Sequence, residues 1–251
     1  MPIVIRTGGG GAGGGDQTYT DTYANIPAAS QDGHLFFPTD ACCIYRDTGA
    51  AWEPWGPVFH VTEPPAAGWS WDNQGAAAVS STKGGVELYG PSHGANNQLH
   101  FYKRAIPAVP YTVTMMIIGN PRAPSTGGGW QAVWGIGWRE SASGKCIAVQ
   151  NWASQAQNYI DIVKWNNSAT YTAQYGATQT YAPLSTGALP PYWRLEDDNT
   201  DRIVSFSNDG FHFQEYHSIG RADFMTADEI GICINPYQYA SAVILLSWEE
   251  A

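Results

Sequence analysis

The chain has 251 residues, enough for one large β-sandwich and a small additional module. Charged residues make up 14% and hydrophobic residues 43%, a balance that argues against a disordered chain and against a surface-rich helical bundle. The formal net charge of −10 would repel a phosphate backbone, so nucleic-acid binding is not expected. No stretch approaches the ~18 apolar residues of a membrane span, and residues 1–6 lead into glycines. We therefore expect no membrane insertion and no signal peptide.

The first 68 residues divide by composition into three segments. Residues 1–15 contain a short apolar strand and then a glycine tract, and this predicts a flexible tether. Residues 16–60 carry apolar runs separated by turn residues, a pattern typical of a small β-meander. Residues 61–68 include two adjacent prolines and predict a stiff linker.

From residue 69 to residue 251, short strand patterns recur with turn residues between them. Hairpins are expected where residues 134–139 meet 146–150 and where residues 192–196 meet 203–207. One helical turn is expected near residues 226–229, and no strand–helix alternation is present. Around ten strands with one apolar face each predict an all-β fold, a jelly-roll sandwich of two antiparallel sheets.

Three stretches resemble parts of known proteins. Residues 23–57, with the motifs GHLFFPTD and YRDTGAAW, resemble a short β-module that recurs in phage tail-fibre and other virion proteins. Residues 69–90, with WSWDNQG and GGVELYG, resemble the opening of a concanavalin A-like jelly roll. Residues 192–248, with YWRLEDD, SNDGFHF and DFMTADEIG, resemble the close of that domain. The order of these motifs is more specific than any one of them.

The resemblance implies a non-enzymatic structural or receptor-binding protein of a tailed-phage virion, such as a tail fibre, tail tip or capsid decoration. The N-terminal module would attach it to the particle or to sister copies, with a homo-oligomer of three favoured by analogy with fibres. Other virion proteins are further expected partners. The jelly roll would bind a host cell-surface polysaccharide or stabilise the shell. The expected location is the virion, after synthesis in the host cytoplasm.

One motif of serine hydrolases and one motif of nucleotide-binding proteins occur in the chain, but neither is followed by the helix that its function needs. Residues 90–94 match the G-x-S-x-G pattern around Ser92, but a further strand follows where the serine-hydrolase elbow needs a helix. Residues 8–13 match G-x-G-x-x-G without a helix after them. We interpret the first as a turn and the second as a consequence of glycine-rich composition.

Jelly rolls also carry glycosidases, which need two carboxylates ~5–9 Å apart. Glu196 and Asp198 have a suitable spacing, but they lead into a turn, where acidic residues serve geometry and solubility. Asp161 stands alone between two isoleucines. We therefore expect no catalytic residue, and a glycan-degrading glycosidase or lyase on the same fold is the alternative hypothesis.

Metal and cofactor sites are not expected either. The acidic cluster at residues 197–201 could hold calcium, but a solvated hairpin tip explains it more simply. The four cysteines at positions 42, 43, 146 and 233 have no zinc-site spacing and are interpreted as small apolar residues.

Tryptophan is the distinctive excess, with 11 residues in the chain. Trp130 and Trp134 share the parity of one strand, and Trp152 comes just beyond the next strand pattern. Aromatic faces stack on sugar rings, so these three residues form the candidate glycan-binding set. The alternative is that they are core residues, as tryptophan often is in β-sandwiches.

Overall fold

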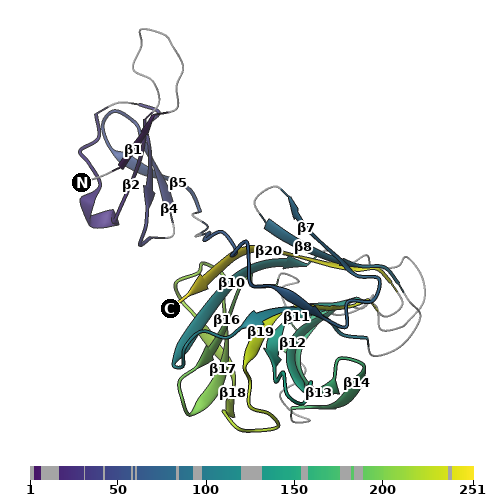
Figure 1. Ribbon diagram of the computed structural model, residues 1–251. Helices are drawn as coiled ribbons and strands as arrows, with labels where there is room; N and C mark the ends of the chain where they lie inside the picture. The colour runs from purple at the N-terminus through teal and green to yellow at the C-terminus, as the bar shows by residue number, and fades with distance from the viewer. Residues whose placement is uncertain are drawn as a thin grey trace. The chain divides into compact units, whose positions relative to one another are not determined.

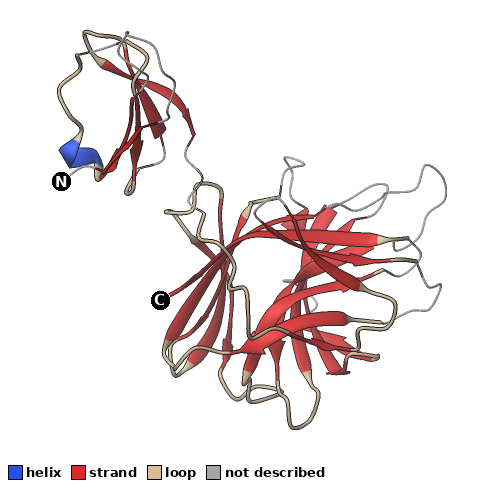
Figure 2. Cartoon of the chain, turned by 45° about the horizontal axis from the view of Figure 1, so that its top comes forward, coloured by secondary structure: helices blue, strands red, loops and turns tan. Residues whose placement is uncertain are grey.

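A computed structural model of the chain describes residues 3–6, 17–30, 32–41, 43–57, 59, 61–82, 85–92, 98–119, 132–153, 158–175, 182–183, 189–236 and 239–251. The chain forms two compact units, one comprising residues 1–60 with 209–212, the other residues 61–208 with 213–251. Strands dominate both units, and Figure 2 shows one short helix, drawn in blue, among the described elements. In the described residues, no helix is long and apolar enough to cross a membrane.

The N-terminal unit is a five-stranded sheet in the order β1-β2-β3-β4-β5 (Figure 1). Its elements are β1 (Ile3–Arg6), β2 (Gln17–Asp21), the 3₁₀ helix η1 (Tyr23–Asn25), β3 (Leu35–Pro38), β4 (Cys43–Asp47) and β5 (Trp52–Pro57). The strand expected within residues 1–15 pairs with β2 and so belongs to this sheet. Strands β2 and β3 run parallel, unlike a meander, because the segment between them is long enough to cross over.

The second unit is the predicted two-sheet antiparallel jelly roll. Its seven-stranded sheet has the order β18-β17-β16-β10-β20-β8-β7. Those strands are β7 (Ala78–Thr82), β8 (Gly85–Gly90), β10 (Tyr111–Gly119), β16 (Tyr192–Asp197), β17 (Asp201–Ser207), β18 (Gln214–Gly220) and β20 (Ser241–Glu250).

The eight-stranded sheet has the order β14-β13-β12-β11-β19-β9-β6, with β15 paired to β13. Its strands are β6 (Ser70–Asp72), β9 (His100–Ala105), β11 (Ala132–Arg139), β12 (Cys146–Ala153), β13 (Asn158–Asn167), β14 (Thr170–Gln174), β15 (Ala182–Pro183) and β19 (Glu229–Asn235). Both predicted hairpins are confirmed, as β11–β12 and β16–β17. The helical turn expected near residues 226–229 is wrong: this segment leads directly into β19.

The main core lies between the two sheets, where alternate residues of each strand point inward. The Trp138 indole N–H also donates a hydrogen bond to the Tyr111 hydroxyl there, at 2.9 Å. The apolar cluster includes Val113, Met115, Trp193, Leu195, Val243 and Leu245 from the seven-stranded sheet, and Trp134, Ile136, Trp138, Ile147, Val149 and Ile232 from the eight-stranded sheet.

The eight-stranded sheet also rolls up on itself. Register shifts in the β13–β14 pairing bend these strands, as bulges do. The backbone N–H of Leu99, just before β9, donates to the carbonyl of Ser168, in the β13–β14 turn, at 2.8 Å. Because three strands separate β13 from β9 in the sheet order, this contact requires strong curvature. We call the face turned away from the seven-stranded sheet the rolled face.

A second apolar cluster fills part of the rolled face. Cys146 and Cys233 belong to it, as small apolar residues, and neither is in a disulfide. Burial raises the pKa of the Cys146 thiol to about 12, so this thiol stays protonated near neutral pH. The cluster consists of Leu99, Phe101, Cys146, Ala148, Val163, Trp165 and Cys233.

Candidate functional site

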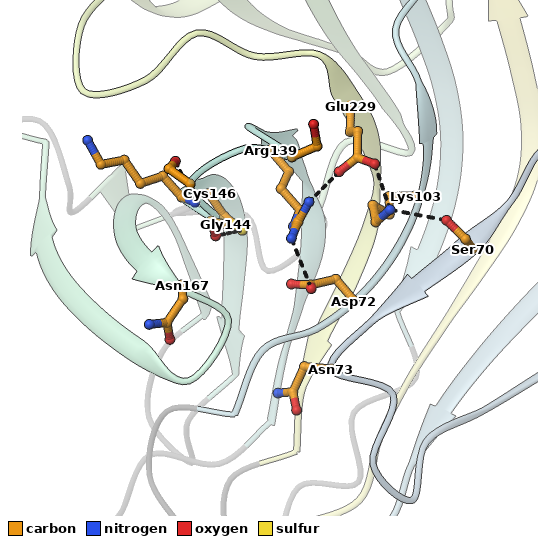
Figure 3. A network of polar contacts seen from close by, with 12 residues as sticks. Ser70, Asp72, Asn73, Lys103, Arg139, Gly144, Cys146, Asn167 and Glu229 are labelled. Atoms are coloured by element: carbon orange, nitrogen blue, oxygen red, sulfur yellow. Dashed lines mark hydrogen bonds and ion pairs between the residues drawn. The ribbon is translucent and has the colours of Figure 1, made fainter.

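A network of ion pairs occupies one end of the rolled face (Figure 3). The Arg139 guanidinium lies between two carboxylates, 3.1 Å from Asp72 and 2.5 Å from Glu229. The Lys103 ammonium lies 2.6 Å from the other oxygen of Glu229 and donates to the Ser70 hydroxyl at 3.1 Å. These contacts join β6, β9, β11 and β19. Both carboxylates are therefore neutralised by cations, which suits a structural role.

Farther along the rolled face, polar side chains replace the apolar ones. Gln150 on β12 and Asp161 on β13 are directly paired across the two strands, and both are 0% exposed. The Gln174 amide donates to Asp161 Oδ2 at 2.6 Å. In the part of the chain that the structure describes, Asp161 Oδ1 and both amide atoms of Gln150 make no hydrogen bond of good geometry. The neighbouring groups are weak partners at most: the Cys233 thiol interacts with Gln150, and the Ile162 backbone N–H interacts with Asp161. Such atoms cost free energy unless something pairs with them.

Burial changes the titration of Asp161. Removal of the carboxyl group from water raises its pKa to about 6, and the hydrogen bond from Gln174 opposes this effect in part. No cationic side chain is paired with Asp161 among the described residues. The carboxyl group can therefore either donate or accept a hydrogen bond within a mildly acidic pH range.

Trp152 and Asn235 extend this polar region toward the end of the sheet. Both are register neighbours of Val133, so they lie on the same face of the sheet as Gln150. Trp152 is half-buried, whereas Asn235 is buried and its side-chain oxygen lacks a partner among the described residues. We call Gln150, Trp152, Asp161, Gln174 and Asn235 the rolled-face polar set.

The structure does not place the predicted tryptophans in one exposed row. Trp134 is opposite Asn151 and Trp152 is opposite Val133, so these two tryptophans point to opposite faces of the sheet. Trp134 is 2% exposed and packs in the main core, with its ring centroid 5.3 Å from that of Trp193. Trp134 is therefore not part of an exposed row, because the alternation of side chains along β11 turns it toward the seven-stranded sheet. Trp130 lies outside the described residues.

The other motif residues lie away from the rolled-face polar set. Glu196 is on β16, in the seven-stranded sheet, where it pairs with Thr112 and Ile203. Asp198 accepts hydrogen bonds from the backbone N–H groups of Thr200 and Asp201, as a turn-forming aspartate does. Ser92 is exposed, and the last two residues of its motif, 93 and 94, lie outside the described residues.

Sequence reasoning missed Gln150 and Gln174 and treated Asp161 as isolated. The available signal was a polar residue inside an otherwise apolar strand, CIAVQNWA for Gln150 and NYIDIVKWNN for Asp161. Only the strand register shows that the two side chains are neighbours. Among the described residues, no group of three or more His, Cys, Asp or Glu side chains is placed to hold a metal ion.

Comparison with known proteins gives likeness of fold only. No family model and no curated protein sequence matches the chain. Among solved structures, a functionally unknown protein from Saccharomyces cerevisiae has a TM-score of 0.51 at 14% identity, covering 73% of this chain and 96% of that one. The carbohydrate-binding module CBM66 from Bacillus subtilis has a TM-score of 0.46 at 11% identity, covering 73% and 94%. A legume lectin-like domain from Entamoeba histolytica has a TM-score of 0.48 at 8% identity, covering 73% of this chain and 89% of that one.

Proposed function

We propose that the jelly roll binds a neutral carbohydrate at the rolled-face polar set, without catalysing a reaction on it. The observation that carries this proposal is the fully buried Gln150 amide, whose two polar atoms make no hydrogen bond of good geometry with the described residues. It lies beside Asp161, which Gln174 contacts through one carboxyl oxygen only. A native protein seldom leaves such groups unpaired without a functional reason. Ligand hydroxyls would supply the missing partners.

The chemistry of the set matches sugar hydroxyls. Each hydroxyl donates one hydrogen bond and accepts others, so it can pair with an amide N–H, an amide oxygen or a carboxyl oxygen. Half-buried Trp152, on the same face, offers an aromatic surface for the apolar side of a sugar ring. The set contains no Lys or Arg, so it favours a neutral sugar over a sulfated or phosphorylated one.

A binding role without catalysis is supported by the carboxylates of the rolled face. A glycosidase uses a general acid and a second carboxylate. Asp161, with its pKa raised to about 6, has the acidity of such an acid and is the feature that favours the enzymatic alternative. The carboxylates of the ion-pair network, Asp72 and Glu229, are held by Arg139 and Lys103 and are poorly suited to be its partner.

The biological setting that we propose is the surface of a tailed-phage particle. It rests on the resemblance of residues 23–57 to virion modules, and the bound sugar would then be a host surface polysaccharide. In this setting the N-terminal unit attaches the protein to the particle, and the jelly roll meets the host or the medium.

Affinity electrophoresis in gels containing neutral polysaccharides tests the binding role. We expect retardation of the wild-type chain by at least one polysaccharide and its loss in Trp152→Ala. Trp55→Ala is the matched control, because Trp55 is 60% exposed and belongs to the N-terminal unit. Equal retardation of the folded Trp152→Ala variant would exclude Trp152 from the site.

Incubation with the retained polysaccharide then separates binding from degradation. A binding protein leaves the number of reducing ends unchanged over hours. New reducing ends that disappear in Asp161→Asn would instead assign a glycosidase with Asp161 as its acid.

A further inference from the structure

A hollow lies on the face of the eight-stranded sheet opposite to the rolled-face polar set, and both sheets of the jelly roll contribute to its lining. It has a volume of about 310 Å³. This is roughly ten times the volume that a water molecule occupies in the liquid. Its lining comes from β10, β11, β12 and the segment before β16, and consists of Ile117, Ile118, Gly119, Trp134, Asn151, Leu189 and Pro191.

We call the Trp134 and Asn151 side chains the floor of the hollow, and they carry three buried polar atoms without partners among the described residues. Asn151 is 1% exposed, and neither its amide nitrogen nor its amide oxygen has a hydrogen-bond partner among the described residues. The indole nitrogen of Trp134 is also buried and lacks a partner in that part of the chain. Asn151 and Trp134 are directly paired across β12 and β11, so these atoms belong to one small area.

Gly119 shapes the wall beside the indole. A Cβ atom at this position would lie 1.9 Å from Trp134 Cε2 and 2.1 Å from Trp134 Nε1. Only glycine lets the indole edge approach the backbone so closely. The remaining lining is apolar, and Ile118, which is 45% exposed, forms part of the open rim.

These atoms define the complementary ligand group. The floor offers donors from Trp134 and Asn151 and one acceptor, the Asn151 oxygen. A secondary amide supplies a carbonyl oxygen whose two lone pairs can accept hydrogen bonds from the Trp134 and Asn151 N–H groups. A carboxylate could accept the same two bonds, but it would bring a charge beside a lining whose described residues include no cation.

We infer that this hollow, formed by Trp134 and Asn151 against Gly119, binds the N-acetyl group of an amino sugar. The acetyl methyl group would contact the apolar lining, and the amide would pair with the floor. The sugar identity rests on the proposed function, whereas the preference for a secondary amide rests on the hollow itself. The hollow lies on the opposite face from the rolled-face polar set, so the two sites can be tested separately.

Nuclear magnetic resonance of the ¹⁵N-labelled full chain tests the inference. The indole N–H signal of Trp134 is assigned by its loss in Trp134→Phe, and the wild-type chain is titrated with N-acetylglucosamine and, separately, with glucose. We expect N-acetylglucosamine to shift this signal to saturation and glucose to leave it unchanged. No shift, or equal shifts from both sugars, would overturn the inference without any variant being needed.

Asn151→Leu should weaken the binding of N-acetylglucosamine at least tenfold, because it keeps the side-chain size and removes the amide. Asn167→Leu is the control, since Asn167 is exposed at the end of β13, outside the lining. Unchanged affinity in a folded Asn151→Leu variant would overturn the inference. A Trp134 response to an N-acetylated peptide but to no sugar would assign the hollow to peptides and likewise overturn it.

The two proposals fail in different ways. Polysaccharide retardation that depends on Trp152, with no Trp134 response to N-acetylglucosamine, contradicts only the inference about the hollow. A saturable Trp134 response with no retardation by any polysaccharide supports the hollow and contradicts the glycan site on the rolled face.

Discussion

Among the described residues, buried side-chain polar atoms that lack a hydrogen-bond partner gather on β11, β12 and β13, although folded proteins usually satisfy such groups. Gln150 and Asn151 are consecutive residues of β12, and because successive side chains alternate, one faces each side of the sheet. The sequence reveals two amides in an apolar strand. It does not reveal which groups surround each amide on its side of the sheet, because this depends on the strand partners.

The pH dependence of stability provides a test of Asp161. Its pKa is about 6 in the folded chain against an ordinary value of 3.8. Between these values the unfolded chain loses the proton while the folded chain keeps it, so stability falls as the pH rises toward 6 and stays lower above it. The free energy of unfolding of Asp161→Asn should not fall over this pH range. Above pH 6 it should exceed that of wild type by up to about 3 kcal/mol. Urea unfolding at several pH values measures the difference, and parallel curves would contradict it.

Trp134 and Trp152 are the members of the predicted set that the structure describes. Truncating them to alanine should lower the free energy of unfolding by different amounts. Trp134→Ala removes a buried core side chain and should cost about 3–5 kcal/mol of unfolding free energy. Trp152→Ala should cost less, about 1–2 kcal/mol, because Trp152 is only half-buried. Thermal melts of the two variants beside wild type measure the contrast. Similar losses for both would show that the two side chains are equally part of the core.

At the scale of strands, hydrophobic alternation and turn residues sufficed to predict the jelly roll and its two hairpins. The rolling of the eight-stranded sheet was not predictable, because it depends on bulges in β13 and on a contact between Leu99 and Ser168. Rolling places Cys146 and Cys233 in a second apolar cluster and forms the rolled face. The parallel pairing of β2 with β3 was missed for a similar reason, since it is non-local.

Glycines in the rolled sheet provide a test at this scale. A Cβ atom at Gly137 would lie 2.3 Å from the carbonyl oxygen of Ile147, so the strand backbones would have to separate. Gly137→Ala should therefore destabilise the domain by about 1–3 kcal/mol or more. Gly220→Ala is the control, because nothing lies within 4 Å of its added Cβ atom. Chemical denaturation of the two variants measures the difference in stability. Equal stabilities would contradict the close approach of the β11 and β12 backbones at Gly137.

At the scale of the whole molecule, the sequence indicated a small N-terminal β-module and a large jelly roll, and the chain has two compact units. The small unit buries little apolar surface, and its Tyr23 side chain is exposed. We expect such a unit to gain stability from association with other copies, three being the favoured number. Light scattering of the full chain should give three times the monomer mass. A monomer at all concentrations would contradict this expectation.

Calorimetric titration is the most direct test of the rolled-face site, using an oligosaccharide cut from the polysaccharide that retards the protein. The wild-type chain should bind it, and Gln150→Leu should weaken binding at least tenfold, or about 1.4 kcal/mol. Trp55→Ala should bind like wild type. Unchanged affinity in a folded Gln150→Leu variant would contradict a glycan site built around the buried amide.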